Sequence, residues 1–142
     1  MLITRETDYA IRAIRALSDG NKWTLAEICE KEVVPHQFGY KIMKKLALAG
    51  FVIIKRGKDG GYIISEDIKD KTMLDLTGVM ETPTEVSPCV IPGYVCEAHK
   101  SQGQPCSVNI RMSALQTAIN DELRSMNLLQ LVSEVKEQAG TA

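Results

Sequence analysis

The chain has 142 residues, 44% of them hydrophobic and 25% charged, which suits a single soluble globular domain with a modest core of its own. No apolar run approaches the roughly 18 residues of a membrane span, and the first residues lack a secretory signal pattern, so we expect a cytoplasmic protein with no membrane partner. The net charge of −1 hides an asymmetry that favours a nucleic-acid-binding front half: residues 1–61 carry eleven basic and seven acidic residues, and residues 62–142 carry six and eleven.

The first half of the chain reads as three helices and a hairpin. Apolar residues at three- and four-residue steps predict a helix from about Thr4 to Ser18, with Thr4 as its N-cap. A short second helix is expected over residues 24–32, and a third over residues 35–49 after a turn at Pro35. Gly50 ends that helix, and two β-branched runs at 51–56 and 61–64 flank a glycine-rich turn, which predicts a β-hairpin.

The second half holds a long irregular segment between helices. A short helix is expected over residues 72–80, followed by a proline- and glycine-rich loop over residues 81–107. A long helix then spans about residues 108–126, and a last short helix is expected over about residues 128–135. The long helix carries a near-heptad apolar stripe suited to pairing with a twin: Val108, Met112, Leu115, Ile119, Leu123 and Met126.

Two helices joined by a tight turn and followed by a hairpin describe a winged helix-turn-helix. We therefore expect a mainly α fold with a small β-hairpin wing and a long dimerisation helix. The second helix of the pair would enter the major groove of double-stranded DNA, where Gln37 can bond adenine and Lys41 can donate to guanine. Lys44 and Lys45 suit phosphates, and the wing suits a minor groove or the backbone. The candidate DNA-contacting residues are His36, Gln37, Tyr40, Lys41, Lys44, Arg56 and Lys58.

The chain has four cysteines, three of which lie in the loop. Cys89, Cys96 and Cys106 are spaced C-x(6)-C-x(9)-C, whereas Cys29 falls on the inner face of the second helix and is expected to be a small buried hydrophobe. Thiolate sulfur is the usual protein ligand of iron–sulfur clusters. Binding three thiolates to one cluster would also cross-link a loop that is long for a compact domain.

Other readings stay open at this point. A structural zinc site could use the three loop cysteines and His99, although zinc sites usually have closer cysteine pairs. A metal-free thiol switch and a protein-interaction module are further alternatives. An enzyme with a small-molecule substrate is not expected, because His36 and His99 are the only histidines and neither belongs to a recognisable catalytic arrangement.

Several segments resemble the IscR/NsrR-type (Rrf-type) family of bacterial regulators. They are TDYAIRAI near the start, LALAGFV after the third helix, KRGKDGGY in the hairpin, the three loop cysteines and the closing LLQLV. The resemblance implies a homodimer that binds DNA through the helix near Gln37 and Tyr40 and through the Arg56 wing. It also implies a 2Fe–2S or 4Fe–4S cluster that senses redox state, nitric oxide or iron supply. The expected function is a transcriptional repressor or dual regulator.

The fourth cluster ligand is left open by the resemblance. One branch of the family places a histidine three positions after the last cysteine, where this chain has Asn109. Another branch uses an aspartate in the first helix of the opposite subunit, and Asp8 matches that position, although Asp8 also suits the helix dipole. His99 is the other candidate. The expected organisation is a DNA-binding unit over 1–80, a cluster-binding loop over 81–107, and a dimerisation helix with a C-terminal helix over 108–142.

Overall fold

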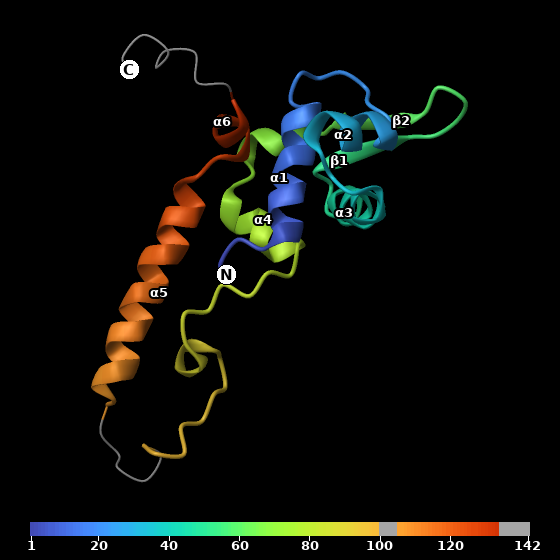
Figure 1. Ribbon diagram of the computed structural model, residues 1–142. Helices are drawn as coiled ribbons and strands as arrows, with labels where there is room; N and C mark the ends of the chain where they lie inside the picture. The colour runs from blue at the N-terminus through green and yellow to red at the C-terminus, as the bar shows by residue number, and fades with distance from the viewer. Residues whose placement is uncertain (100–104, 134–142) are drawn as a thin grey trace, which may run out of the picture.

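A computed structural model describes residues 1–99 and 105–133, so that residues 100–104 of the loop and 134–142 of the C-terminal segment lie outside the described residues. Figure 1 shows the helices of residues 5–79, the hairpin and the short helix after residue 127 gathered in one unit, from which the long helix of residues 107–125 projects with the cysteine loop beside it. The expected mainly helical fold with a two-stranded wing is confirmed. The elements are α1 (Arg5–Leu17), α2 (Leu25–Glu32), α3 (His36–Leu48), β1 (Val52–Lys55), β2 (Gly61–Ile64), η1 (Glu66–Asp70), α4 (Met73–Val79), η2 (Pro88–Val90), α5 (Ser107–Ser125) and α6 (Leu128–Val132).

Threonine hydroxyls set the starts of three helices. Thr4 accepts a hydrogen bond from the Thr7 amide at 3.2 Å, which confirms it as the N-cap of α1. Thr24 caps α2 in the same way. At α4, Thr72 and Asp75 form a capping box in which each side chain bonds the other residue's backbone. Each cap satisfies amide groups that the first turn of a helix leaves without a partner.

Helix α1 lies at the centre of the core and contacts α2, α3 and α6. Its buried side of small residues, Ala10, Ala13 and Ala16, allows these helices to approach closely. Larger side chains from α1 itself and from the surrounding elements complete the core: Ile14, Leu17, Ile28, Ile42, Met43, Leu46, Leu76 and Leu128. The core therefore fixes α3 relative to α1.

The wing is a two-stranded antiparallel sheet in which Val52 faces Ile64 and Lys55 faces Gly61. Trp23, just before α2, adds an isolated bridge through two backbone hydrogen bonds with Tyr62, at 2.8 and 3.0 Å. Gly61 makes this approach possible, because a Cβ atom there would lie 2.7 Å from the Trp23 carbonyl oxygen. The bridge attaches the wing to the helix-turn-helix, and the sequence pattern did not predict it.

The C-terminal end of α5 is tied to the compact unit by backbone hydrogen bonds on both sides of Asn127. The Met73 amide donates to the Met126 carbonyl at 2.8 Å, and the Leu128 amide donates to the Lys71 carbonyl at 3.0 Å. Leu123 is the one fully buried residue of this helix among the described residues. The first half of α5 therefore extends past the core (Figure 1).

The turn between α2 and α3 contains a strained residue. Val33 has a left-handed backbone, with φ 55° and ψ 52°, and its side chain is 76% exposed. A β-branched residue pays a steric cost of about 1–2 kcal/mol in this conformation, whereas asparagine tolerates it. We expect Val33→Asn to raise the free energy of unfolding by about 1 kcal/mol in urea titrations. Val33→Ala, which keeps a Cβ atom, should gain less, and a Val33→Asn protein no more stable than the wild type would contradict the strain.

Candidate functional site

The outward face of α3 and the wing carry the expected DNA-contacting residues, three of which, Tyr40, Lys44 and Arg56, line one groove. At 100° per residue, Gln37, Lys41 and Lys44 lie opposite the buried Ile42 and Leu46. The candidate residues are all exposed: His36, Gln37, Tyr40, Lys41, Lys44, Arg56 and Lys58. The arrangement offers hydrogen-bond donors and positive charge to a polyanion, in the helix-and-wing geometry that duplex DNA accepts.

Two acidic residues pair with lysines on the flank of α3 that faces α1 and α4. Glu6 of α1 lies 2.9 Å from the Lys41 amine, and Glu81, just after α4, lies 3.4 Å from the Lys45 amine. Solvent-exposed pairs of this kind contribute about 0–1 kcal/mol, so Lys41 can exchange Glu6 for a phosphate or base at little cost. These pairs were not foreseen from the sequence, because they join residues far apart along the chain.

The cysteine loop brings all three of its thiols to one pocket. Cys89, Cys96, Cys106 and His99 line a pocket of about 550 Å³ beside the start of α5. Ser87 contacts the Cys89 sulfur at 3.2 Å. As arranged, the described residues, 1–99 and 105–133, contain no cluster of three His, Cys, Asp or Glu side chains close enough to hold a metal ion. The pocket thus gathers soft donors within one segment without bringing them into contact.

Helix α5 holds the first part of this loop through its amide side chains. The Asn109 amide donates to the Cys89 carbonyl at 2.8 Å. Gln116 accepts from the Val86 amide at 2.8 Å and donates to the Thr84 carbonyl at 3.0 Å. The residue that stands at the family's histidine position is therefore a support for the loop backbone.

The start of the loop is fastened to α1 and α3. Glu81 adopts a left-handed conformation with φ 54°, and the next residue, Thr82, hydrogen-bonds through its hydroxyl to the hydroxyl of Thr7 at 2.5 Å. Thr7 belongs to α1 and is fully buried, while Glu81 pairs with Lys45 of α3. A displacement of the loop start would therefore be felt by α1 and α3 of the same protomer.

Asp8 lies apart from the loop cysteines within one chain. Its carboxylate pairs with Arg12 one turn along α1 at 3.1 Å, and it lines a different pocket with Thr4 and Arg5. Cys29 is also separate: it is buried in α2, as expected, and burial raises the pKa of its thiol. Its sulfur faces Gly39 of α3, where a Cβ atom would lie 2.6 Å away.

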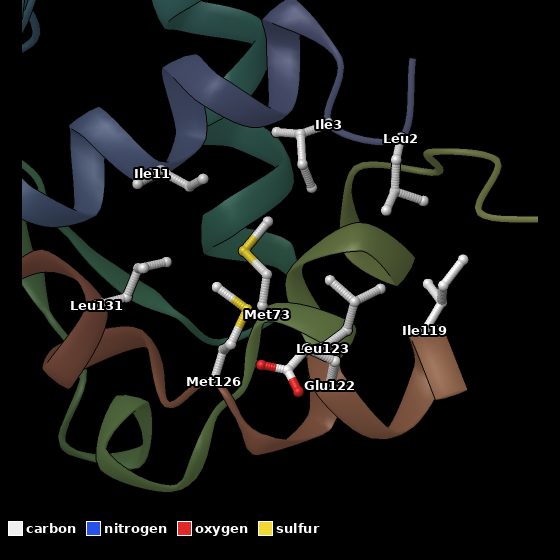
Figure 2. Close-up of a pocket in the computed structure, with 9 residues that line it drawn as sticks. All are labelled: Leu2, Ile3, Ile11, Met73, Ile119, Glu122, Leu123, Met126 and Leu131. Carbon is white, nitrogen blue, oxygen red and sulfur yellow. The ribbon is translucent and has the colours of Figure 1, made fainter. Parts of the chain in front are cut away.

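An apolar groove of about 380 Å³ lies between α1, α4, α5 and α6. Figure 2 shows side chains from these elements converging on it, with Glu122 as the one charged residue of the lining. The apolar lining comprises Leu2, Ile3, Ile11, Met73, Ile119, Leu123, Met126 and Leu131. Ile119 and Met126 also belong to the apolar stripe of α5, so groove and stripe form one continuous surface.

Comparisons with known proteins agree with this arrangement. The Rrf2 family model, described as an iron-dependent transcriptional regulator, matches residues 3–134. An Rrf2-like HTH-type transcriptional regulator of Rhodobacter capsulatus is 28% identical over 111 residues, which cover 74% of this chain and 69% of that protein. The structure of CymR, the global cysteine regulator of Bacillus subtilis, superposes with a TM-score of 0.71 at 21% identity, covering 93% of this chain and 96% of CymR. The structure of IscR of T. potens superposes with a TM-score of 0.68 at 20% identity, covering 93% of this chain and 86% of that IscR chain.

No helix among residues 1–99 and 105–133 is long and apolar enough to cross a membrane.

Proposed function

Because the chain belongs to the Rrf2 family of transcriptional regulators, we propose that it binds operator DNA as a homodimer under the control of an iron–sulfur cluster held by its cysteine loop. Family membership confirms a DNA-binding transcription regulator with a winged helix, and it confirms that the chain is not an enzyme. The proposed site of action is the bacterial cytoplasm, where the chromosome lies. The proposed organisation is a DNA-binding unit over 1–80, a sensor loop over 81–107 and a dimerisation segment over 108–142.

The surface of α3 and the wing supports the proposed mode of DNA binding. Gln37 and Lys41 stand near the start of α3, where base edges are reached, and Lys44 suits a phosphate. Arg56 and Lys58 lie at the wing tip, which suits the minor groove or the backbone. Because such contacts are electrostatic, the affinity of the protein for DNA should fall steeply as the salt concentration rises.

Dimerisation is supported by the exposed apolar side chains in the first half of α5. Val108 and Leu115 are exposed on a helix whose apolar stripe runs into the groove of Figure 2. A contiguous apolar surface of this kind on a soluble protein marks an interaction site. A second copy supplies the same stripe. Two-fold pairing of identical helices would also present two DNA-binding units to an operator.

By chemical type the donors in the loop pocket suit an iron–sulfur cluster, and the three thiols would have to move closer together to bind one. Cys89, Cys96 and Cys106 would supply three thiolates, and the fourth ligand would be Asp8 of the partner subunit or His99 of the same loop. The observation that carries the proposal is that three thiols separated by C-x(6)-C-x(9)-C spacing line one pocket. A bound cluster would supply iron–thiolate bonds that oxidants and nitric oxide attack.

The loop contacts suggest how the chain's own residues would pass this signal on. Thr82 and Glu81 hold the loop start against Thr7 and Lys45, which belong to α1 and α3. An Asp8 that served the partner's loop would have to give up its ion pair with Arg12, so the two subunits would be linked through α1. Both routes change the pose of α3, on which a half-site spacing of about 34–36 Å depends.

The test is spectroscopy of protein purified without air. We expect brown protein with visible absorption and with iron and acid-labile sulfide in matching amounts. Replacing Cys89, Cys96 and Cys106 together with serine should abolish the colour and leave DNA binding unresponsive to nitric oxide. Asp8→Ala and His99→Ala then separate the two ligand choices, since only the true ligand's loss should shift the spectrum while leaving the dimer intact.

Contrary outcomes point to the alternatives. Colourless protein with stoichiometric zinc would replace the cluster with a zinc site, and metal-free protein that forms a disulfide on oxidation would replace it with a thiol switch. The Cys29→Ala protein is the matched control, because this thiol is buried away from the loop and its removal should leave colour and response unchanged. A DNA affinity that is sequence-selective but does not change with salt concentration would argue against phosphate contacts by the basic residues of α3 and the wing.

A further inference from the structure

A groove between α3 and the wing combines apolar and basic side chains. It has a volume of about 320 Å³, and its lining includes Tyr40, Lys44 and Leu48 from α3 and Ile54 and Arg56 from the wing side. None of the residues that line it is acidic. Leu48 is 80% exposed and Tyr40 is 63% exposed, which is unusual for large side chains that share one groove.

The positions of these residues make them one ridge of the recognition helix. Tyr40, Lys44 and Leu48 follow each other at four-residue steps, so their side chains lie in a row along α3. The row is about 12 Å long at 1.5 Å per residue, which corresponds to roughly three to four base steps of about 3.4 Å. The row faces Arg56 and Ile54 across the groove.

The charge of the groove identifies its occupant as one strand of the operator. Lys44 and Arg56 place a cation on each side, which suits the phosphates of a strand passing between recognition helix and wing. The apolar side chains on either side of Lys44 in the row, Tyr40 and Leu48, match the one apolar feature on base edges in the major groove, the 5-methyl group of thymine. A protein partner would have no need of a cation on both rims.

We propose that Tyr40 and Leu48 read the methyl groups of thymines in this strand while Lys44 and Arg56 hold its phosphates. The inference deepens the proposed function and rests on it, because it names the bases that α3 prefers. The operator should carry thymines about three to four positions apart in each half-site, on the strand that runs beside the wing.

The experiment removes methyl groups and nothing else. The wild-type protein first selects its preferred duplex from a random-sequence pool, and each thymine of that duplex is then replaced in turn by deoxyuridine. At one or two positions per half-site we expect about a three- to fivefold loss of affinity, the value of one buried methyl group. Leu48→Ala and Tyr40→Ala should each bind thymine and deoxyuridine equally at the position they read.

Two matched variants separate base reading from other effects. Ile53→Ala removes a similarly apolar side chain, 45% exposed, from the strand residue next to Ile54 but outside the groove, and it should keep the full preference for thymine. Lys44→Gln should weaken binding to both duplexes equally and lower the salt dependence by about one phosphate contact.

The outcomes are distinct. Equal binding of thymine and deoxyuridine duplexes by the wild type would overturn the inference and leave the proposed function standing. A Leu48→Ala protein that loses the same factor on both duplexes would assign Leu48 to the sugar backbone and overturn its role in base reading. Failure of the wild type to select any sequence would overturn the proposed function itself.

Discussion

Replacing Leu115 with glutamate should convert the protein from a dimer into a monomer and weaken operator binding at least about 100-fold. Leu115 lies in the middle of the α5 stripe and is 46% exposed within a single chain. In a two-fold interface each substitution occurs twice, so two carboxylates would be buried against apolar side chains without partners. The loss of affinity follows because a monomer holds one half-site and gives up the second, effectively intramolecular binding event.

Light scattering and DNA titrations measure the two effects on the same preparation. Thr117→Glu is the matched control: it adds the same charge to the same helix, but residue 117 lies on the side of α5 opposite the stripe and is exposed. That variant should remain dimeric and bind DNA as the wild type does. A Leu115→Glu protein that stayed dimeric would move the interface away from the α5 stripe.

The local features of the fold were predictable because short stretches of sequence determine them. Helix starts follow from hydroxyl side chains placed before apolar periodicity, and the structure confirms Thr4 as a cap and α1 to α5 within about one residue of their expected ends. The hairpin follows from β-branched runs around a glycine-rich turn. By contrast, η1 and the Trp23–Tyr62 bridge were missed, since one is a short turn without periodicity and the other pairs residues 39 positions apart.

The candidate site divides in the same way. Exposure of the α3 and wing residues could be foreseen from helical periodicity, and so could the burial of Cys29. The hydrogen bond between Thr82 and Thr7 and the ion pair between Glu81 and Lys45 could not be foreseen, because they depend on how α4 ends against α1 and α3. The hydrogen bond from the Asn109 amide to the Cys89 carbonyl could not be foreseen either, since the sequence gives no signal that an amide on α5 faces a backbone carbonyl of the loop.

The ion pair between α1 and α2 was likewise missed, although it lies within the DNA-reading unit. The Arg15 guanidinium bonds both oxygens of the Glu32 carboxylate, at 2.5–3.1 Å, and Arg12 bonds the Glu32 carbonyl at 3.1 Å. Glu32 is buried, whereas half of the Arg15 side chain remains exposed. The hydrogen bond with Glu32 raises the pKa of Arg15, which favours the charged guanidinium.

Removing one partner of this ion pair should destabilise the fold more than replacing both partners by apolar side chains. Arg15→Met leaves the Glu32 carboxylate buried with no cation, and we expect it to lower the free energy of unfolding by about 2–3 kcal/mol, less than for a fully buried pair because Arg15 is half-exposed. Arg15→Met with Glu32→Met replaces both charges by apolar side chains of similar length and should recover most of that loss. Urea titrations of the wild type, the single and the double variant measure the difference. If the double variant were as unstable as the single one, the stabilisation would come from the pair itself, and the orientation of α2 against α1 would depend on charge rather than on packing.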